Sequence, residues 1–302
     1  MSLQEIQPQY GSLITTPEIG LTFEDFANQP EYMQVNRQLV EVLLPLLPEI
    51  YVHVDVATGT ALVPKLLIDG SERRGLKGKI IGIDPNNVSL DIAKKTTHGT
   101  GNILVKFIEG KGQDLRTLLR GEIPEEGVES VSIYNSIHEI PGEDTKRSVI
   151  KSMTDILRNG GLFSYNSAFT TIAMEDSAMD WGKWKMAAFG LFKGTRIRGM
   201  EPIKIHTPEE YRQMLEEAGL VIMHEARNVV NLSRSALEAI SRYPEFAEGV
   251  FRDMKDTLNV TLEEKSKKLI SALDQLNIPG IKRTWHEIIA QKPLVPAFSP
   301  RD

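Results

Sequence analysis

Short apolar runs alternate with helix-like segments through the first half of the chain. The runs are rich in β-branched residues, which favours buried strands, and the segments between them repeat apolar residues at helical spacing. The expected strands are residues 51–56, 79–84, 103–108, 129–135 and 161–166, and the expected helices are residues 61–69, 86–95, 114–120 and 143–157. Strands that alternate with helices form parallel sheets with right-handed crossovers. The pattern therefore predicts an α/β fold with helices on both faces of a sheet.

Helical patterns also flank this block. Residues 1–20 contain several prolines and glycines and are expected to be extended, whereas residues 23–47 have a helical apolar face. Thr207-Pro208-Glu209-Glu210 combines a capping threonine, a proline at the first helical position and a glutamate that completes a capping box. Thr261-Leu262-Glu263-Glu264 is a second capping box. A helix is expected to begin at each of these two sites.

Two later segments have strand character, residues 221–230 and residues 283–290. We expect residues 283–290 to be the last strand of the same sheet. The helical residues 233–278 would then be an insertion into the sheet domain rather than a separate C-terminal domain. Absence of pairing between residues 283–290 and the sheet would contradict this interpretation.

The amino-acid composition and charge exclude several classes of function. The chain has 302 residues, of which 41% are hydrophobic and 25% charged, as in ordinary globular proteins. Its formal net charge of −6 argues against nucleic-acid binding, and the lack of cysteine excludes thiol catalysis and disulfides. The N-terminus lacks the basic and apolar regions of a signal peptide, and the apolar run over residues 39–47 is too short to span a membrane. We expect a cytoplasmic enzyme.

The segment Asp55-Val56-Ala57-Thr58-Gly59-Thr60-Ala61 follows the first expected strand and has the composition of a ligand-binding turn. Small residues let a ligand approach the backbone, and Asp84, which ends the next strand, can accept hydrogen bonds from ribose hydroxyls. A dinucleotide fingerprint needs three glycines, but Ala57 and Leu62 stand at two of those positions. The other pattern, acidic-x-Gly-x-Gly-x-Gly, keeps its acid and its middle glycine and suits a sulfonium nucleoside.

This segment resembles the first motif of class I S-adenosylmethionine-dependent methyltransferases, although Ala61 departs from the last glycine. The order of elements over about residues 36–292 is similar to the same family. The resemblance implies a Rossmann-like sheet of seven strands with helices on both faces, in which the seventh strand is antiparallel and lies beside the fifth. It also implies an N-terminal arm or lid over residues 1–35 and a methyltransferase domain over residues 36–302. Helical insertions would form a lid (residues 167–205) and a cap (residues 231–280).

The resemblance also implies where S-adenosylmethionine binds. Asp55 and Gly59 would shape the cofactor loop, Asp84 would hold the ribose, Asp114 the adenine, and Asn135 the methionine end. Asp114 could instead cap the following helix, a common use of aspartate. The residues expected at the cofactor are Asp55, Ala57, Thr58, Gly59, Asp84, Pro85, Gln113, Asp114, Asn135 and Ser136.

His138 and Glu139 follow the fourth strand, on the expected substrate side of the cofactor. His138 is the first candidate for a general base because the ordinary pKa of histidine lies near neutrality, and Glu139 is the second. An aromatic segment with interleaved cations, residues 168–200, is expected to wall the substrate, with core packing as the alternative. The residues expected at the substrate are Tyr10, Tyr32, Tyr165, Trp181 and Trp184.

The sequence thus predicts methyl transfer to an oxygen, nitrogen or carbon atom of a small molecule that is partly apolar or aromatic. The alternatives are a NAD-dependent oxidoreductase on a similar sheet and a methyltransferase-like scaffold protein without turnover. No metal is expected, because His138, Glu139, His206 and His224 lack diagnostic ligand spacing. Neither nucleic acid nor membrane is expected as a partner, and the apolar residues 168–192 and the helical block offer surfaces for a homodimer.

Overall fold

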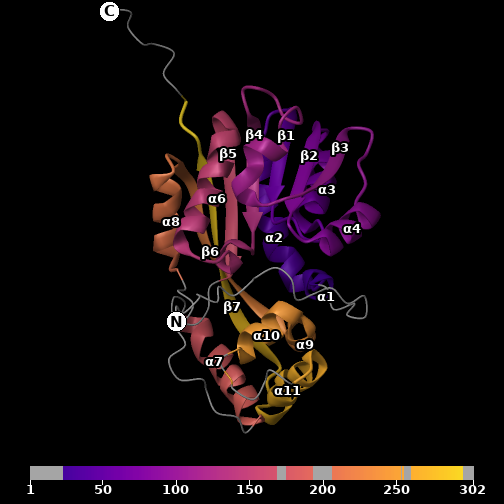
Figure 1. The fold of residues 1–302 in the computed structure, drawn as a ribbon, viewed down its shortest axis with the longest axis vertical. Coiled ribbons are helices and arrows are strands. Elements are labelled where there is room, and N and C mark those ends of the chain that lie inside the picture. The colour runs from indigo at the N-terminus through magenta and orange to yellow at the C-terminus, as the bar shows by residue number, and fades with distance from the viewer. Residues whose placement is uncertain (1–22, 169–174, 193–205, 253, 255–259, 295–302) are drawn as a thin grey trace, which may run out of the picture.

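The computed structural model describes residues 23–168, 175–192, 206–252, 254 and 260–294. These residues form one seven-stranded sheet with helices on both faces, and a lobe of helices that lies beyond one end of the strands (Figure 1). Since β5 and the strands parallel to it run towards this lobe, the carboxyl ends of the parallel strands face it. This is the edge at which open α/β sheets bind their ligands.

The sheet has the order β3-β2-β1-β4-β5-β7-β6, and β7 is antiparallel to both of its neighbours. The prediction that residues 283–290 return to the sheet beside the fifth strand is therefore confirmed. The strands are β1 (Ile50–Val56), β2 (Lys77–Asp84), β3 (Ile103–Glu109), β4 (Val128–Tyr134), β5 (Leu157–Ala168), β6 (Val221–Ser233) and β7 (Gly280–Gln291).

Helices cover the two faces of the sheet and bury two separate apolar cores. One core lies between the sheet and α5, α6 and α8, and the other lies between the sheet and α2 and α3. The elements around the sheet are α2 (Pro30–Leu43), η1 (Leu44–Leu46), α3 (Leu62–Arg74), α4 (Asn87–Thr96), η2 (Gly112–Asp114), α5 (Leu115–Leu118), η3 (Ile137–Glu139), α6 (Glu143–Ile156) and α8 (Pro208–Glu217). Both predicted capping boxes are present, at Thr207 and at Thr261.

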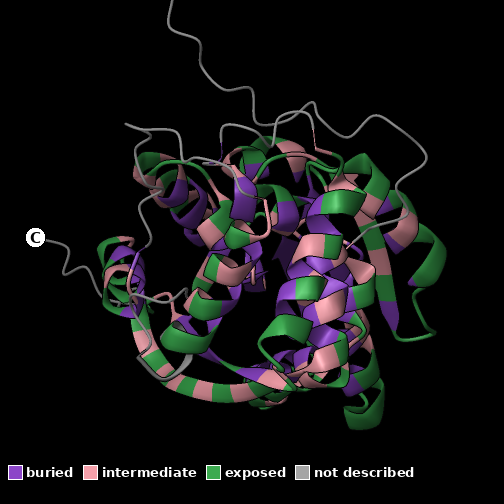
Figure 2. Cartoon of the chain, turned by 90° about the horizontal axis from the view of Figure 1, so that it is seen from below, coloured by how far each residue is buried: buried purple, intermediate pink, exposed green. Residues whose placement is uncertain are grey.

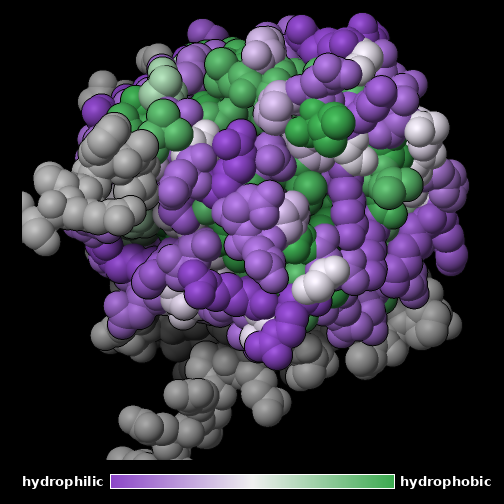
Figure 3. Space-filling view, turned by 90° about the horizontal axis from the view of Figure 1, so that it is seen from above, coloured by the Kyte–Doolittle hydropathy of each residue, from purple (hydrophilic) through white to green (hydrophobic). Residues whose placement is uncertain are grey.

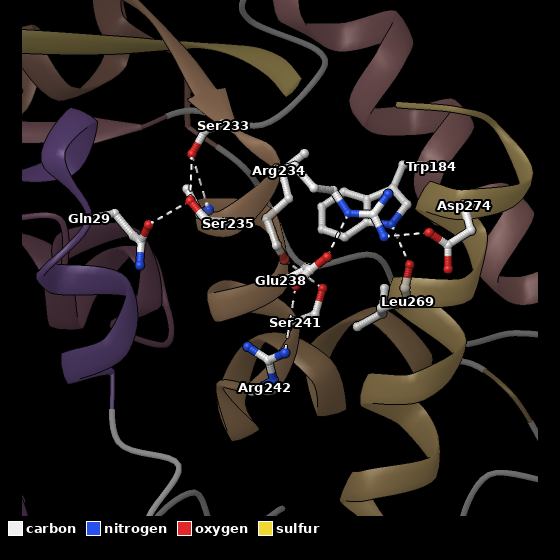
Figure 4. Close-up of polar contacts among 12 residues, drawn as sticks. Gln29, Trp184, Ser233, Arg234, Ser235, Glu238, Ser241, Arg242, Leu269 and Asp274 are labelled. Carbon is white, nitrogen blue, oxygen red and sulfur yellow. Dashed lines mark hydrogen bonds and ion pairs between the residues drawn. The ribbon is translucent and has the colours of Figure 1, made fainter. Parts of the chain in front are cut away.

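The lobe is built from α1 (Glu24–Ala27), α7 (Glu175–Gly190), α9 (Arg234–Arg242), α10 (Pro244–Phe251) and α11 (Leu262–Gln275). It has an aromatic core of its own, in which Trp184 is fully buried. The indole N–H of Trp184 donates to the main-chain oxygen of Leu269 at 2.9 Å, and Arg234 joins α9 to α11 by an ion pair with Asp274 (Figure 4). Segments that are far apart in the sequence therefore form one packed unit.

The antiparallel pair of β6 and β7 extends from the sheet into the lobe. The pairing of β6 with β7 runs from Val221 and Gln291 to Ser233 and Gly280, whereas β5 pairs with β7 only as far as Trp285. The first residues of β7 and the last residues of β6 thus leave the sheet as a two-stranded ribbon. Along most of β6, exposed and half-buried residues alternate, and they form a banded strip at the edge of the molecule (Figure 2).

Two helical segments differ from their predicted outlines, residues 233–278 and residues 114–120. Residues 233–278 are not helical throughout: Pro244 begins a new helix, and a further break separates α10 from α11. From the two expected insertions, α7 and α11 pack against each other in the shared core. The helix expected over residues 114–120 is a 3₁₀ turn followed by the four-residue α5. None of the described helices has the length and apolar character needed to cross a bilayer.

Candidate active site

The turn after β1 has a backbone that normally requires glycine. Ala57, Gly59 and Ala61 all have positive φ angles, of 56°, 54° and 71°. Left-handed backbone costs a non-glycine residue about 1–2 kcal/mol, so the turn keeps the conformation of a glycine-rich loop under local strain. A Cβ placed on Gly59 would meet nothing within 4 Å, which leaves room for a ligand beside the loop.

Asp84 is held rigidly beside this loop. Its two carboxylate oxygens accept the main-chain N–H groups of Gly59 and Asn86, both at 2.8 Å. The residue is only 8% exposed, and burial raises the pKa of its carboxyl group above the ordinary value. Each oxygen keeps a second lone pair, so the oriented carboxylate can still accept hydrogen bonds from the two hydroxyls of a ribose.

Asp55 lies behind the loop and is buried in the protein. It is 1% exposed and accepts a hydrogen bond of 2.5 Å from the hydroxyl of Ser132. Burial raises the pKa of Asp55 to about 7, and the hydroxyls of Ser132 and Thr58 oppose that rise. Ser132 also contacts His53, whose pKa is lowered to about 3 by burial, so this imidazole is neutral. Ser132 on β4 is a supporting residue that sequence reasoning missed.

At the end of β3, the carboxylate of Asp114 is exposed and makes no capping hydrogen bond to α5. The alternative role of Asp114 as a side-chain cap is therefore not realised. Gln113 precedes it and is half-buried. Because the ends of β2 and β3 pair at Asp84 and Glu109, this segment follows β3 on the same edge of the sheet as Asp84.

Asn135, after β4, is fixed by distant parts of the chain. Its φ is +57°, its amide nitrogen donates to Asn36 at 2.8 Å, and its amide oxygen accepts the indole N–H of Trp285 at 2.6 Å. Asn166 donates to the same oxygen of Asn36. The side chain of Asn135 is thus engaged by α2 and β7, and its main-chain N–H donates to the main-chain oxygen of Asn166 at 2.9 Å. Asn36, Asn166 and Trp285 carried no local sequence signal.

His138 and Glu139 lie on η3, next to the lobe. The Nδ1 atom of His138 is 2.8 Å from the hydroxyl of Ser167. Burial, together with the charges of Arg283 and Lys146, lowers the pKa of His138 to about 3.

Glu139 has the opposite shift. Glu139 is a solvent-exposed residue, although neighbouring protein partly desolvates its carboxyl group. This environment, with the charges of Glu245 and Asp84, raises the pKa of Glu139 to about 8. Burial raises the pKa of Tyr32 on α2 and of Tyr243 in the lobe, and the charge of Glu139 adds to both shifts. Sheet edge, α2 and lobe thus meet around this glutamate.

The aromatic residues expected at the substrate separate into different places. Tyr32 packs against Trp285 and lies close enough to Glu139 to feel its charge. Tyr165 is 1% exposed and lies in the main core beside Tyr211. Trp184 is buried in the lobe core, whereas one face of the Trp181 ring lies 4.4 Å from the guanidinium carbon of Arg283. Tyr10 lies outside the described residues.

Two further features concern metal and ligand binding. Among the described residues, no three histidine, aspartate or glutamate side chains gather to hold a metal ion. A hollow of about 350 Å³ lies between α2 and β6 and includes Gln34 and Asn231 in its lining. It lies on the edge of the sheet and does not include any residue of the loop or of η3. The end of the molecule that lies away from the helical lobe shows hydrophilic side chains with hydrophobic patches among them (Figure 3).

This geometry agrees with the comparison with known protein families. The model of the ubiE/COQ5 methyltransferase family matches residues 47–227, which include the loop, Asp84, Asn135 and η3. The chain belongs to the ubiE/COQ5 methyltransferase family. It is an S-adenosylmethionine-dependent methyltransferase, as the first motif indicated.

Solved structures of other methyltransferases share the fold. A protein assigned as a methyltransferase from Bacillus halodurans C-125 aligns with a TM-score of 0.53 at 17% identity, over 84% of this chain and 98% of its own. One assigned as a sarcosine dimethylglycine methyltransferase from Galdieria sulphuraria aligns with a TM-score of 0.50 at 12% identity, over 87% and 86%. Among curated proteins, no match to this methyltransferase was found.

Proposed function

We propose that this methyltransferase acts on a small, partly apolar or aromatic molecule that binds between the carboxyl ends of the strands and the helical lobe. The observation that carries the proposal is the environment of Glu139. It lies on the sheet side, yet its pKa responds to Glu245 of the lobe, and it acts on Tyr32 and Tyr243. Acidic and aromatic groups from three elements therefore surround one place beside the cofactor loop, as expected of a small-molecule site.

The residues at the strand ends fit S-adenosylmethionine, which supplies a methyl group already activated on a sulfonium. The loop over Ala57, Thr58 and Gly59 leaves open space, Asp84 presents an oriented carboxylate to the ribose, and Asp114 has an exposed carboxylate for the adenine. We expect Pro85 and Gln113 to line the same groove. The main-chain oxygen of Asn135 and the main-chain N–H of Ser136 would contribute at the methionine end, because the N–H of Asn135 and the oxygen of Ser136 are bonded within the protein. Asp55 would act from behind the loop.

The pKa values of His138 and Glu139 on η3 favour Glu139 over His138 as the general base. With a pKa of about 3, His138 is neutral throughout the physiological range and is a weak proton acceptor, so we assign it to holding the substrate. Glu139 has a pKa of about 8, close to the operating pH at which a general base is most effective. We propose that Glu139 accepts the proton of a nucleophile that must lose one, and that the other residues align the acceptor.

The acceptor class is tested by incubating the enzyme with S-adenosylmethionine labelled on its methyl group and a fractionated cell extract. We expect the label in the small-molecule fraction, in a product that partitions into organic solvent or absorbs in the near ultraviolet. The same reaction with the Asp84→Ala variant is the blank. Label that appears only in the protein or nucleic-acid fraction contradicts a small-molecule acceptor.

The role of Glu139 predicts a pH dependence. Only the carboxylate form accepts a proton, so kcat/KM should rise as pH increases through about 8. Glu139→Gln should remove this rise and lower turnover about 10²–10⁴-fold, while the affinity for S-adenosylhomocysteine stays unchanged. Glu126→Gln, at an exposed loop position, is the matched control. A Glu139→Gln profile that still rises through pH 8 removes Glu139 as the base.

A further inference from the structure

Arg283 is buried without a carboxylate partner. It lies on the part of β7 that has left the sheet, and it is 8% exposed. One terminal nitrogen donates to the main-chain oxygen of Ala168 at 3.1 Å, and the guanidinium lies over the ring of Trp181. No carboxylate within the described part of the chain lies within 4.0 Å of it, although the more exposed Arg147 and Arg212 each pair with glutamates.

A second cation lies on the same tryptophan. The Nζ atom of Lys185 on α7 is 5.9 Å from the centroid of the Trp181 ring and 5.7 Å from that of Phe246. It too lacks a carboxylate within 4.0 Å among the described residues. Burial and the charge of Arg283 lower the pKa of Lys185 to about 8, which indicates that the two cations are close enough to repel each other.

Two like charges in a largely desolvated place are unfavourable unless an anion joins them. An arginine guanidinium has five N–H donors in a planar fork, and the interactions found here use one donor and one ring face. The remaining donors can bind two oxygens of one carboxylate or phosphate, the geometry for which arginine is best suited. Cation–π contacts with Trp181 hold the guanidinium in place and leave those donors unused.

The pair of cations also lies next to the residues of η3. Ala168, which accepts the hydrogen bond from Arg283, directly follows Ser167, the hydrogen-bonding partner of His138. The charge of Arg283 is felt at His138, and it contributes to keeping that imidazole neutral. An anion bound to Arg283 would therefore lie on the lobe side of His138, while Glu139 faces the acidic and tyrosine groups.

We propose that Arg283 and Lys185, arranged on Trp181, bind an anionic group of the methyl acceptor, either a carboxylate or a phosphate. The inference rests on the proposed function, since it specifies the substrate class for that same site. The acceptor is then a small apolar or aromatic acid whose anionic end is held in the lobe, while the atom that receives the methyl group lies towards His138 and Glu139.

The probes are benzoate, phenyl phosphate and the neutral benzyl alcohol, titrated into the full-length enzyme loaded with S-adenosylhomocysteine. Binding is followed by calorimetry and by tryptophan fluorescence, to which Trp181 contributes together with Trp184 and Trp285. We expect benzoate or phenyl phosphate to bind about tenfold or more tightly than benzyl alcohol, because a hydrogen bond to a charged group is worth about 1.5–3 kcal/mol. Whichever anion binds more tightly identifies the group.

Substitutions of Arg283 and Lys185 test whether the anion binds at these two cations. Arg283→Gln should weaken binding of the preferred anion about tenfold or more, and Lys185→Gln should weaken it about threefold or more. Lys183→Gln is the matched control, because Lys183 lies on the same helix and pairs with Asp180 at 3.6 Å. If Arg283→Gln fails to fold, Lys185→Gln decides the question.

Anion affinity that is unchanged in Lys185→Gln, or equal affinity for benzoate, phenyl phosphate and benzyl alcohol, overturns the proposal. Such a result leaves the proposed function standing if the labelled methyl group still reaches a small molecule. Label found only in macromolecules overturns the proposed function, whatever the anion titration shows.

Discussion

The sheet half of the molecule and the helical lobe build their sites in different ways. At the sheet edge, side chains follow the strands one by one, and main-chain groups orient them, as Gly59 and Asn86 orient Asp84. In the lobe, the candidate site residues come from α7, from α10 and from the ribbon of β7, and aromatic contacts hold them. The difference indicates that main-chain groups of the adjoining loops orient Asp84 at the sheet edge, whereas the residues in the lobe depend on tertiary packing of distant segments.

The largest effect should come from Asp84→Ala, which should weaken cofactor binding at the sheet edge and leave the lobe folded. Losing two charged hydrogen bonds to the ribose should weaken S-adenosylhomocysteine about 10²–10⁴-fold, and it also frees the N–H of Gly59. Calorimetry measures the affinity, and protection of the lobe amides from hydrogen exchange should stay unchanged. Asp91→Ala, at an exposed aspartate of α4, is the control. Wild-type affinity in Asp84→Ala would remove this residue from the cofactor site.

Trp184→Ala should destabilise the lobe and leave the cofactor loop intact. The ring is fully buried and its N–H donates to Leu269, so truncation should destabilise the lobe by about 3–5 kcal/mol. Hydrogen exchange should become faster in α7 and α11, while S-adenosylhomocysteine affinity changes little. Met179→Ala, on the exposed side of the same helix, should leave the lobe intact. Equal loss of protection in the sheet would mean that the two halves unfold together.

Asp55 makes the stability of the sheet half depend on pH. Its carboxyl group has a pKa of about 7 in the folded protein, against an ordinary value of 3.8, so the folded state keeps a proton that the unfolded chain has lost. The stabilisation is complete below about pH 4 and is lost as pH rises to about 7.

Asp55→Asn should therefore match the wild-type stability near pH 4 and exceed it near pH 8, by as much as about 4 kcal/mol. Urea unfolding across this pH range measures the difference, with Asp91→Asn as the control. A stability difference that does not change with pH would show that Asp55 ionises normally.

The smallest effect should come from the strained turn. Ala57→Gly removes the strain of a positive φ at a half-buried position and should stabilise the protein by about 0.5–1 kcal/mol. Ala61→Gly relieves similar strain but also removes a fully buried methyl group, so its gain should be smaller. Thermal unfolding compares the two. Destabilisation by Ala57→Gly would show that the methyl group makes a contact that outweighs the strain.

The sequence predicted the sheet half well because the rules involved are local. Short apolar runs rich in β-branched residues identify the strands, and a polar residue at each strand end, such as Asp84 or Asn135, must lie on one edge of a parallel sheet. Even β7 was recognised from its strand propensity, and its pairing with β5 and β6 is confirmed.

The remaining features depend on residues far apart in sequence. Asn36, Asn135 and Trp285 come from three elements, and nothing near any one of them indicates the other two. The pKa values of His138 and Glu139 could not be predicted from the sequence either, because they depend on burial and on the charges of Arg283 in β7 and Glu245 in the lobe.

The place of β7 in the sheet has a consequence for synthesis on the ribosome. β7 lies between β5 and β6, which do not pair with each other, yet it is made after both of them and after α9, α10 and α11. Until it emerges, β5 ends the growing sheet with an unsatisfied edge and β6 has no strand partner among the described residues. Nascent chains should therefore remain open to chaperones and proteases until the final strand inserts, in a single late closing step.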